Sequence, residues 1–282
     1  MKIFSNAVII ITGAASGIGK ELSLQLAATG ARLILCDIQE TKLYAVEAQI
    51  KQTGGTAEAY MLDVTDASAF EQAIQYVADK YGVVDYLFNN AGIANTGEMQ
   101  DLQVKHWKKV IDVNLMGVIY GTSFAYRQMV KQKKGHIVNI ASLAGLCAMP
   151  LGLPYTTSKH GVVGLSKGLR EEGKAYNIKV TVVCPGFIES SIYGSAEQAN
   201  ADTSDSRAMI PFKLVPVDKA VSIILKGVAN NKAMIVFPFY GKLIRFLQNT
   251  FPALLNGIHK KVLRDFRKLK SAKLATAIKS SL

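Results

Sequence analysis

Short apolar runs rich in β-branched residues alternate with longer segments of helical periodicity along most of this 282-residue chain. Continuous apolar strands separated by helices are typical of a parallel sheet covered by helices on both faces. The alternation therefore predicts a doubly wound, mainly parallel α/β fold. Its first two helices are expected to begin near Gly17 and Thr41. The predicted strands are 7–11, 32–36, 56–62, 85–88, 136–140, 178–183 and 233–237.

Composition favours one large domain with a basic end. Hydrophobic residues make up 49% of the chain and charged residues 19%, which is enough for one large core. We predict an α/β domain over residues 1–240 and a helical C-terminal extension over residues 241–282. The extension holds ten Lys or Arg and one Asp, so it carries +9 of the net charge of +12 and leaves +3 for the domain.

The chain carries no sign of an exported, metal-binding or membrane-spanning protein. No apolar run reaches the roughly 18 residues of a spanning helix, and a strand beginning at Ala7 leaves no room for a cleavable signal peptide. Cys36, Cys147 and Cys184 lie far apart, which fits reduced thiols in a core. None of the four histidines neighbours a cysteine at a metal-binding spacing. We therefore expect a cytoplasmic protein without a metal site.

Three glycines follow the first predicted strand, in the run Thr12-Gly13-Ala14-Ala15-Ser16-Gly17-Ile18-Gly19. Glycines placed there allow a tight turn, a close approach of backbone to a pyrophosphate and close packing of the following helix. The N-terminus of that helix offers free N–H groups and the positive end of its dipole to the anion. The run therefore predicts a nucleotide site.

Asp37 closes the second predicted strand, 24 residues after Gly13. A carboxylate in that place accepts hydrogen bonds from the ribose hydroxyls of an adenosine and repels a 2′-phosphate. Neither Ser16 nor Ile38 supplies a cation for such a phosphate, so NAD is favoured over NADP. The alternative is a solvated acid at the end of a strand.

Tyr155 and Lys159 are four residues apart, so a helix would place both side chains on one face. An ammonium about 4 Å from a phenol contributes about 4 kcal/mol at an effective dielectric near 20. That would bring the tyrosine pKa from roughly 10 towards 7, where it can exchange protons near neutral pH. A pair of surface side chains is the alternative.

Together these motifs resemble the short-chain dehydrogenase/reductase family, in its group with a Rossmann-type fold. The glycine run matches the pattern Thr-Gly-x-x-x-Gly-x-Gly, and Tyr155 with Lys159 matches Tyr-x-x-x-Lys. The resemblance covers about residues 5–240, in family order and at family spacing. The remaining matches are Asp63-Val64, Asn89-Asn90-Ala91-Gly92, Asn114, Ser142 and Pro185-Gly186.

The resemblance implies an oxidoreductase that acts on a CH–OH group with NAD. Tyr155 would be the acid/base, and Lys159 would lower its pKa and hold the nicotinamide ribose. Ser142 would hydrogen-bond the reacting oxygen, and Asn114 would bind a water that links Lys159 to solvent. Singly, the serine could be a helix cap and the asparagine could satisfy backbone groups. The implied cofactor-binding residues are Gly13, Ser16, Gly17, Ile18, Gly19, Asp37, Asp63, Val64, Asn90, Ala91, Gly92, Tyr155, Lys159, Pro185 and Gly186.

One position departs from the family pattern. Members often carry a threonine shortly after the Pro-Gly turn, whereas this chain continues Phe187-Ile188-Glu189-Ser190. Ser190 is the candidate for the contact that the threonine would make with the cofactor carboxamide. The resemblance also implies a homodimer or homotetramer.

The substrate is expected to be hydrophobic. The segment Leu143–Leu153 holds no cation that would bind a carboxylate or a phosphate, which favours an apolar alcohol or ketone, with lipid-like or steroid-like molecules as candidates. The polar run 194–207 lacks helical or strand periodicity, and it is either a lid over the site or a plain surface insertion.

The C-terminal extension has the pattern of a basic amphipathic helix. Apolar residues between 247 and 269 fall on one helical stripe opposite a basic face, and Pro252 is expected to divide it into two segments. Such a helix suits an anionic membrane surface. Docking on the protein's own body or on a sister subunit is an equal alternative, and nucleic acid is the least favoured.

A second class of function stays open beside the enzyme. The chain could be a catalytically silent NAD-binding sensor or scaffold whose tail binds a membrane or a partner. The complete set of Ser142, Tyr155 and Lys159 argues against it, since a sensor has no need of an acid/base pair.

Overall fold

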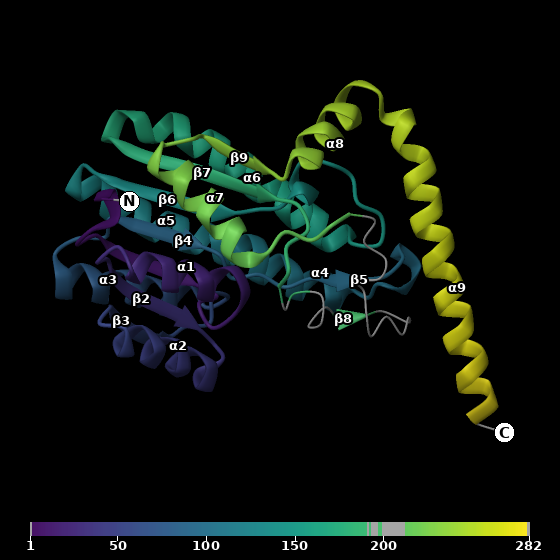
Figure 1. Ribbon diagram of the computed structural model, residues 1–282, viewed down its shortest axis with the longest axis horizontal. Coiled ribbons are helices and arrows are strands. Elements are labelled where there is room, and N and C mark those ends of the chain that lie inside the picture. Colours follow the sequence, from purple (N-terminus) through teal and green to yellow (C-terminus); the bar gives the residue numbers. More distant parts are fainter. Residues whose placement is uncertain (1, 191, 193–196, 199–211, 281–282) are drawn as a thin grey trace.

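Seven parallel strands form one sheet in the computed structural model, which describes residues 2–190, 192, 197–198 and 212–280. Their order across the sheet is β3-β2-β1-β4-β6-β7-β9 (Figure 1). The strands are β1 (Val8–Thr12), β2 (Arg32–Asp37), β3 (Thr56–Met61), β4 (Tyr86–Asn89), β6 (Gly135–Ile140), β7 (Ile178–Pro185) and β9 (Met234–Phe237). Each predicted strand is present, with ends that differ by at most two residues, so the predicted fold class is confirmed.

Two very short strands that the sequence pattern did not predict form a separate parallel pair, β5 (Asn95–Thr96) and β8 (Glu197–Gln198). β8 is the part of the polar run 194–207 that the structure describes, and the rest of that run lies outside the described residues. The helices are α1 (Gly17–Ala27), α2 (Glu40–Gln52), α3 (Ala67–Tyr81), α4 (Val104–Ile111), α5 (Gly117–Gln132), α6 (Leu153–Gly173), α7 (Val217–Ala229), α8 (Phe239–Thr250) and α9 (Asn256–Ser280).

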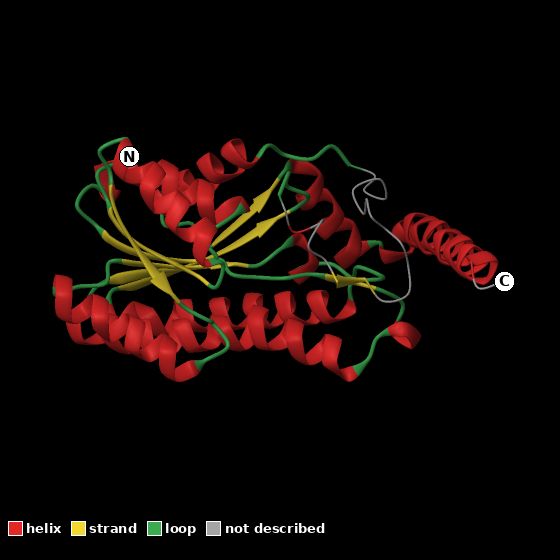
Figure 2. Ribbon diagram, turned by 90° about the horizontal axis from the view of Figure 1, so that it is seen from below, coloured by secondary structure: helices red, strands yellow, loops and turns green. Residues whose placement is uncertain are grey.

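Helices cover both faces of the sheet, as Figure 2 shows edge-on. Successive side chains of a strand point to opposite faces of the sheet, and those of β1 alternate in this way. Ile9 and Ile11 pack in the core beneath α1, α2 and α7, whereas Val8 and Ile10 pack in the core beneath α3 and α5. Burial on both faces explains why β1 is a continuous apolar run.

The direction of winding reverses at β1. The chain builds outward from β1 through β2 to β3, then returns to place β4 on the other side of β1. In an open parallel sheet, such a reversal leaves a crevice outside the carboxyl ends of the strands, where ligands bind. The fold therefore fixes the place of the site.

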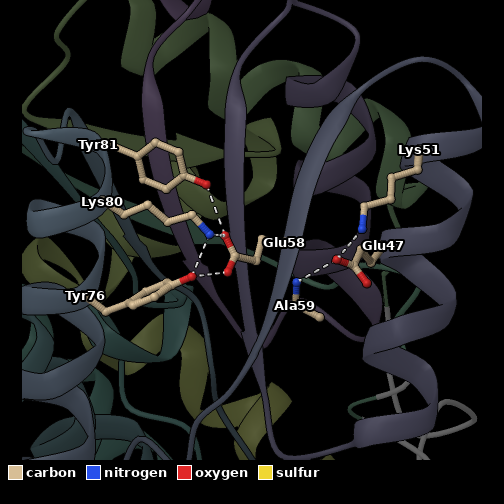
Figure 3. A network of polar contacts seen from close by, with 7 residues as sticks. All are labelled: Glu47, Lys51, Glu58, Ala59, Tyr76, Lys80 and Tyr81. Carbon is tan, nitrogen blue, oxygen red and sulfur yellow. Dashed lines mark hydrogen bonds and ion pairs between the residues drawn. The ribbon is translucent and has the colours of Figure 1, made fainter.

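The edge strand β3 carries a charged network on the face that α3 covers (Figure 3). Glu58 accepts hydrogen bonds from Lys80 at 2.8 Å, from Tyr81 at 3.1 Å and from Tyr76, all three on or at the end of α3. Burial would raise the pKa of Glu58, but these hydrogen bonds together lower it below its usual value. On the other side of β3, the backbone N–H of Ala59 donates to Glu47 at 3.2 Å. Charges at an edge strand discourage pairing with another chain.

The C-terminal extension forms two helices, as expected from the proline. α8 ends at Thr250, a 3-10 turn covers Pro252–Leu255, and α9 follows. Figure 1 shows α9 in yellow along the end of the molecule that carries α4 and β5. Within the described part of the chain, no helix is both long enough and apolar enough to span a bilayer.

α9 docks on the body of its own chain through both apolar and ionic contacts. Phe266 is fully buried and packs with Leu151, while Arg267 pairs with Glu98 at 2.8 Å and Lys270 pairs with Asp101. Burying a phenylalanine side chain contributes about 2 kcal/mol. The carboxylates of both ion pairs, on Glu98 and Asp101, are largely buried. The apolar and the ionic contacts therefore both hold α9 against the body of the chain.

All three cysteines are free and buried. Cys36 and Cys184 lie in the hydrophobic core, as their apolar surroundings in the sequence suggested. Burial raises the pKa of Cys184 to about 12 and that of Cys147 to about 11, so both stay neutral thiols at physiological pH.

Candidate active site

The glycine turn between β1 and α1 has the backbone that its sequence predicted. Gly13 and Gly17 have φ angles of +67° and +51°, a region that favours glycine. A Cβ on Gly19 would lie 2.0 Å from the carbonyl oxygen of Gly13, so this glycine permits α1 to pack against the turn. Gly13, Ser16, Gly17 and Ile18 line a cavity at the start of α1, and the N-terminus of a helix suits a pyrophosphate.

A cavity of about 420 Å³ lies at the carboxyl ends of the strands, beside the glycine turn. All but one of the residues assigned to the cofactor line it, and the exception is Gly19, which packs behind the turn. Ser190 also lines it. The lining residues that were assigned from the sequence are Gly13, Ser16, Gly17, Ile18, Asp37, Asp63, Val64, Asn90, Ala91, Gly92, Tyr155, Lys159, Pro185 and Gly186.

Asn90 ties the glycine turn to the end of β4. Its side-chain amide donates to the carbonyl oxygens of Thr12 at 2.9 Å and Gly13 at 3.2 Å. The Thr12 hydroxyl in turn accepts from the backbone N–H groups of Asn90 at 3.0 Å and Ala91 at 3.1 Å. These four bonds fix two cavity walls relative to one another.

Asp37 lies at the end of β2 with its carboxylate largely buried at the cavity wall. Its two oxygens accept from the backbone N–H groups of Ala15 at 3.0 Å and Gln39 at 2.9 Å. The carboxylate therefore also ties the glycine turn to β2. Each carboxylate oxygen keeps a further lone pair for hydrogen bonding, and Asp37 lines the cavity.

Sequence reasoning missed Lys42, which lines the same cavity from α2. Its ammonium donates to the Gln39 side chain at 2.8 Å. The prediction of NAD rested on the absence of a cation at Ser16 and at Ile38, whereas Lys42 is five residues beyond Asp37. The position of Lys42 in the first turn of the helix after β2 could have indicated it, because that turn lies beside the cavity.

Asn114 is fully buried in a π-helical turn, Asp112–Met116, between α4 and α5. Its side chain accepts from the N–H of Ile93 and donates to the carbonyl oxygen of Ile93, both at 2.8 Å, and it donates to Ser158 at 3.3 Å. π-turns occur frequently at functional sites. The amide therefore satisfies the backbone groups of Ile93, just after Gly92, which was the alternative to a catalytic role. The assignment of Asn114 to a bound water stays a prediction.

Tyr155 and Lys159 lie on one face of α6, as the spacing predicted. The Lys159 ammonium is buried, donates to the carbonyl oxygen of Ile140 at 2.8 Å, and lies 5.6 Å from the centroid of the Tyr155 ring. Both side chains line the cofactor cavity. The surface-pair alternative is therefore wrong for this chain, since Lys159 is 3% exposed.

The pKa values of the pair differ from the simple expectation. Burial raises the pKa of Tyr155 above its usual value, and a hydrogen bond with the Ser142 side chain opposes part of that rise. Burial also lowers the pKa of Lys159, to about 8. The raised pKa of Tyr155 differs from the expectation that Lys159 lowers it towards 7, and burial of the phenol is the largest cause.

Ser142 follows β6 and begins a 3-10 turn, Leu143–Gly145. Its hydroxyl accepts from the N–H of Ala144 at 3.1 Å and also hydrogen-bonds Tyr155. Ser142 therefore caps this turn, as the alternative suggested. Its catalytic assignment stays a prediction. Ser142 lines the cofactor cavity and a second cavity beside it.

The second cavity has a volume of about 280 Å³ and is lined mostly by apolar side chains. The predicted wall contributes seven of its residues, and no lysine or arginine is among the described residues that line it. Ser142, Tyr155 and Gly186 line both cavities, so the candidate acid/base lies where the two meet. The seven wall residues are Leu143, Cys147, Ala148, Met149, Pro150, Leu151 and Gly152.

The C-terminal extension supplies another wall of this cavity, which the domain boundary at residue 240 had separated from the site. The contributing residues are Ile244, Leu255, Ile258, His259 and Val262. The apolar stripe between residues 247 and 269 indicated that one face of the extension is packed. Only the structure shows that this face packs on the cavity wall.

Aromatic residues close the cavity near the Pro185-Gly186 turn. Phe212 stacks on Tyr240 with ring centroids 4.4 Å apart, and Phe187 stacks on Phe212 at 6.0 Å. The Tyr240 hydroxyl accepts from the N–H of Phe187 at 3.0 Å. Both Phe187 and Phe212 line the cavity.

Comparison with known proteins identifies the class. The family model of the short chain dehydrogenases matches residues 7–201. The chain belongs to the short-chain dehydrogenase/reductase family, and it is an oxidoreductase of the class that acts on CH–OH and keto groups.

Relatives and a solved structure agree with that assignment. The chain is 38% identical over 200 residues to the 3-oxoacyl-acyl-carrier-protein reductase FabG of Thermotoga maritima, which covers 71% of this chain and 81% of the relative. It is 33% identical over 254 residues to the putative oxidoreductase SadH of Mycobacterium tuberculosis, covering 88% and 91%. A short-chain dehydrogenase/reductase from Burkholderia phymatum, solved in complex with NAD, superposes with a TM-score of 0.82 at 26% identity, covering 90% of this chain and 96% of that one.

Proposed function

We propose that the protein is an NAD(H)-dependent oxidoreductase that interconverts a secondary alcohol and a ketone, or an alcohol and an aldehyde, on a hydrophobic substrate. The observation that carries the proposal is the position of Ser142 and Tyr155 at the junction of the polar and the apolar cavity. A nicotinamide cofactor supplies the hydride when bound. The residues of this chain provide binding, orientation and proton transfer.

The cofactor cavity fits a dinucleotide in its donor set. The glycine turn presents N–H groups for a pyrophosphate, Asp37 presents carboxylate oxygens for ribose hydroxyls, and Lys159 presents an ammonium for the second ribose. NAD is preferred over NADP in this proposal because Asp37 would repel a 2′-phosphate.

Proton transfer is assigned to Tyr155. Because its pKa is raised by burial, its hydroxyl is protonated at neutral pH and suits donation of a proton to a carbonyl oxygen. Ser142 would hydrogen-bond the same oxygen and stabilise its developing negative charge. This arrangement favours reduction of a ketone at neutral pH.

The test is a spectroscopic screen of apolar alcohols and ketones that follows NADH absorbance in both directions. Tyr155→Phe is expected to lower kcat at least ~1,000-fold and to change the Kd of NADH less than ~3-fold, since it removes a proton donor and little volume. A wild-type protein that binds NADH but turns over no member of the panel would favour the sensor or scaffold alternative.

We also propose peripheral membrane contact through the C-terminal extension. Five large apolar residues of α8 and the following turn are 48–78% exposed, and we call them the apolar platform: Phe239, Leu243, Phe246, Phe251 and Leu254. Contiguous exposed apolar surfaces mark interaction sites. The basic residues of the extension favour an anionic bilayer as the partner.

The surface proposed for membrane contact differs from the stripe that the sequence suggested. Leu255 and Phe266 of that stripe are buried against the protein's own body. Phe251 and Leu254 remain exposed beside the second, apolar cavity, which we call the substrate cavity. A bilayer at the platform would offer hydrophobic substrate directly to the cavity. A homo-oligomer, which the family resemblance implied, is the competing occupant.

A further inference from the structure

Buried polar atoms without a hydrogen-bond partner are concentrated in one wall of the substrate cavity. The described part of the chain has six such side-chain atoms, and three of them are the amide nitrogen and oxygen of Asn95 and the hydroxyl of Thr156. Both residues line the substrate cavity. The other buried amides without a full set of partners, Asn89 and Gln248, each lack one only at the side-chain oxygen, whereas both amide atoms of Asn95 lack one.

The two residues come together because β5 runs beside the start of α6. The N–H of Gly97 donates to the carbonyl oxygen of Leu151 at 2.8 Å, and the N–H of Thr156 donates to that of Gly152 at 2.8 Å. Asn95 is 5% exposed, and a Cβ on Gly152 would lie 4.0 Å from its backbone oxygen. Tyr155 lines the same cavity, so both polar groups share it with the candidate acid/base.

The chemistry of these groups points to an uncharged ligand. A buried amide or hydroxyl without a partner is costly, and an apolar side chain of the same shape would avoid that cost. Asn95 offers both donors and an acceptor, and Thr156 offers one donor and acceptor lone pairs. No lysine or arginine is found among the described residues of the cavity wall, where His259 is the one side chain that can carry a positive charge, so a neutral ligand suits the cavity better than a carboxylate or a phosphate.

We propose that Asn95 and Thr156 form a polar subsite that binds a second, uncharged oxygen of the substrate, beside the carbon that reacts at Tyr155. The substrate class is then a hydrophobic hydroxy or oxo compound with a further neutral carbonyl or hydroxyl, such as an ester, a thioester or an amide. The inference rests on the proposed oxidoreductase function and sharpens its substrate class.

Paired substrates and isosteric variants test the subsite. The substrates are medium-chain 3-, 4- and 5-oxo esters and plain ketones of equal length. Asn95→Leu is expected to lower kcat/KM for the preferred oxo ester about 10- to 100-fold and to leave that for the plain ketone within about twofold, because only the oxo ester loses a partner. Thr156→Val is expected to act in the same direction, and Thr157→Val, on the exposed neighbour, is the control.

A binding assay separates the subsite from the catalytic proposal. Calorimetry on Tyr155→Phe saturated with NADH should show tighter binding of the oxo ester than of the ketone, and Asn95→Leu in the same background should remove that preference. Binding that depends on Asn95 without any wild-type turnover would overturn the oxidoreductase proposal and keep the subsite. Equal effects of Asn95→Leu on both substrate classes, or no effect in either assay, would overturn the subsite.

Discussion

The Lys159 ammonium lies 5.6 Å from the centroid of the Tyr155 ring and donates to the carbonyl oxygen of Ile140. Its charge is therefore held over the ring, at the end of β6, in a buried position. Burial lowers the pKa of Lys159 to about 8, within the range of ordinary assays.

The first prediction concerns the alkaline limb of the pH profile. Lys159 carries its charge below its pKa of about 8 and loses it above. We expect kcat/KM for ketone reduction to fall as pH rises through about 8, because kcat/KM reports groups of the free enzyme. Measurement from pH 6 to 10 checks this. In any Lys159→Arg protein that retains activity, the limb should move above pH 10, since the guanidinium stays charged. If kcat/KM of the Lys159→Arg protein still falls near pH 8, another group causes the fall.

The second prediction is a gain in stability from loss of the same charge. Holding a charged Lys159 in the folded state costs about 3 kcal/mol at pH 7, since its pKa falls from 10.5 to about 8 and each unit corresponds to about 1.4 kcal/mol. The unfolded chain binds the extra proton between pH 8 and 10.5, so stability rises with pH across that window.

Urea unfolding of Lys159→Met at several pH values measures this effect. The variant should unfold at a higher urea concentration than the wild type at pH 7, while its activity is lost. The difference should shrink as pH rises towards 10.5. A variant less stable than the wild type at pH 7 would mean that the bond to Ile140 outweighs the buried charge.

The third prediction assigns part of the acid sensitivity to His136. This side chain is buried in β6, hydrogen-bonds Thr181 at 2.8 Å and packs against the Tyr86 ring, with centroids 5.5 Å apart. Burial, with Lys179 and Arg170 nearby, lowers the pKa of His136 to about 3. Between pH 6.5 and 3 the unfolded chain binds the extra proton, so stability falls as pH falls through that window.

Replacing His136 with Gln should flatten this part of the stability curve. Urea unfolding at pH 5 and pH 7 should show a smaller loss for the variant than for the wild type, by up to about 2 kcal/mol, which is the linkage for one group over 1.5 pH units. His160, which is exposed on α6, is the matched control, and His160→Gln should leave the pH dependence unchanged. Parallel curves for His136→Gln and the wild type would contradict the assignment.

The extent of sequence-based prediction differs between the parts of this protein. The strands and the glycine turn could be predicted because local patterns decide them: β1 is buried on both faces, and Gly13 needs a positive φ. The tyrosine pKa could not, because it depends on where the Lys159 ammonium lies relative to the ring.

The substrate cavity depended even more on long-range contacts. Its apolar wall was visible in the sequence as a run without cations. The hydrogen bond from Gly97, just after β5, to Leu151, just before α6, and the docking of α9 through Phe266 bring together segments far apart in the chain. No local pattern signalled that Asn95 would be buried without a partner.

The fourth prediction concerns the choice between NAD and NADP. Asp37→Asn removes the negative charge and keeps an acceptor for Ala15 or Gln39. We expect KM for NADH to rise about tenfold and activity with NADPH to appear, because Lys42 in the same cavity then attracts the 2′-phosphate without an opposing carboxylate. Steady-state kinetics with both cofactors measures the switch. Adding Lys42→Ala should remove the gained NADPH activity, and a wild type that already prefers NADPH would contradict the role given to Asp37.

The fifth prediction concerns the apolar platform. Wild-type protein should co-sediment with vesicles that contain anionic lipid and less with neutral vesicles, since both apolar and charged residues contribute to binding. The double variant Phe246→Ser, Leu254→Ser should lose most of this binding, because both side chains are more than half exposed and available to the bilayer. Ile3→Ser, on an exposed apolar residue at the opposite end of the chain, is the matched control. If the double variant instead changes the mass measured by light scattering without vesicles, the platform joins two copies of the chain.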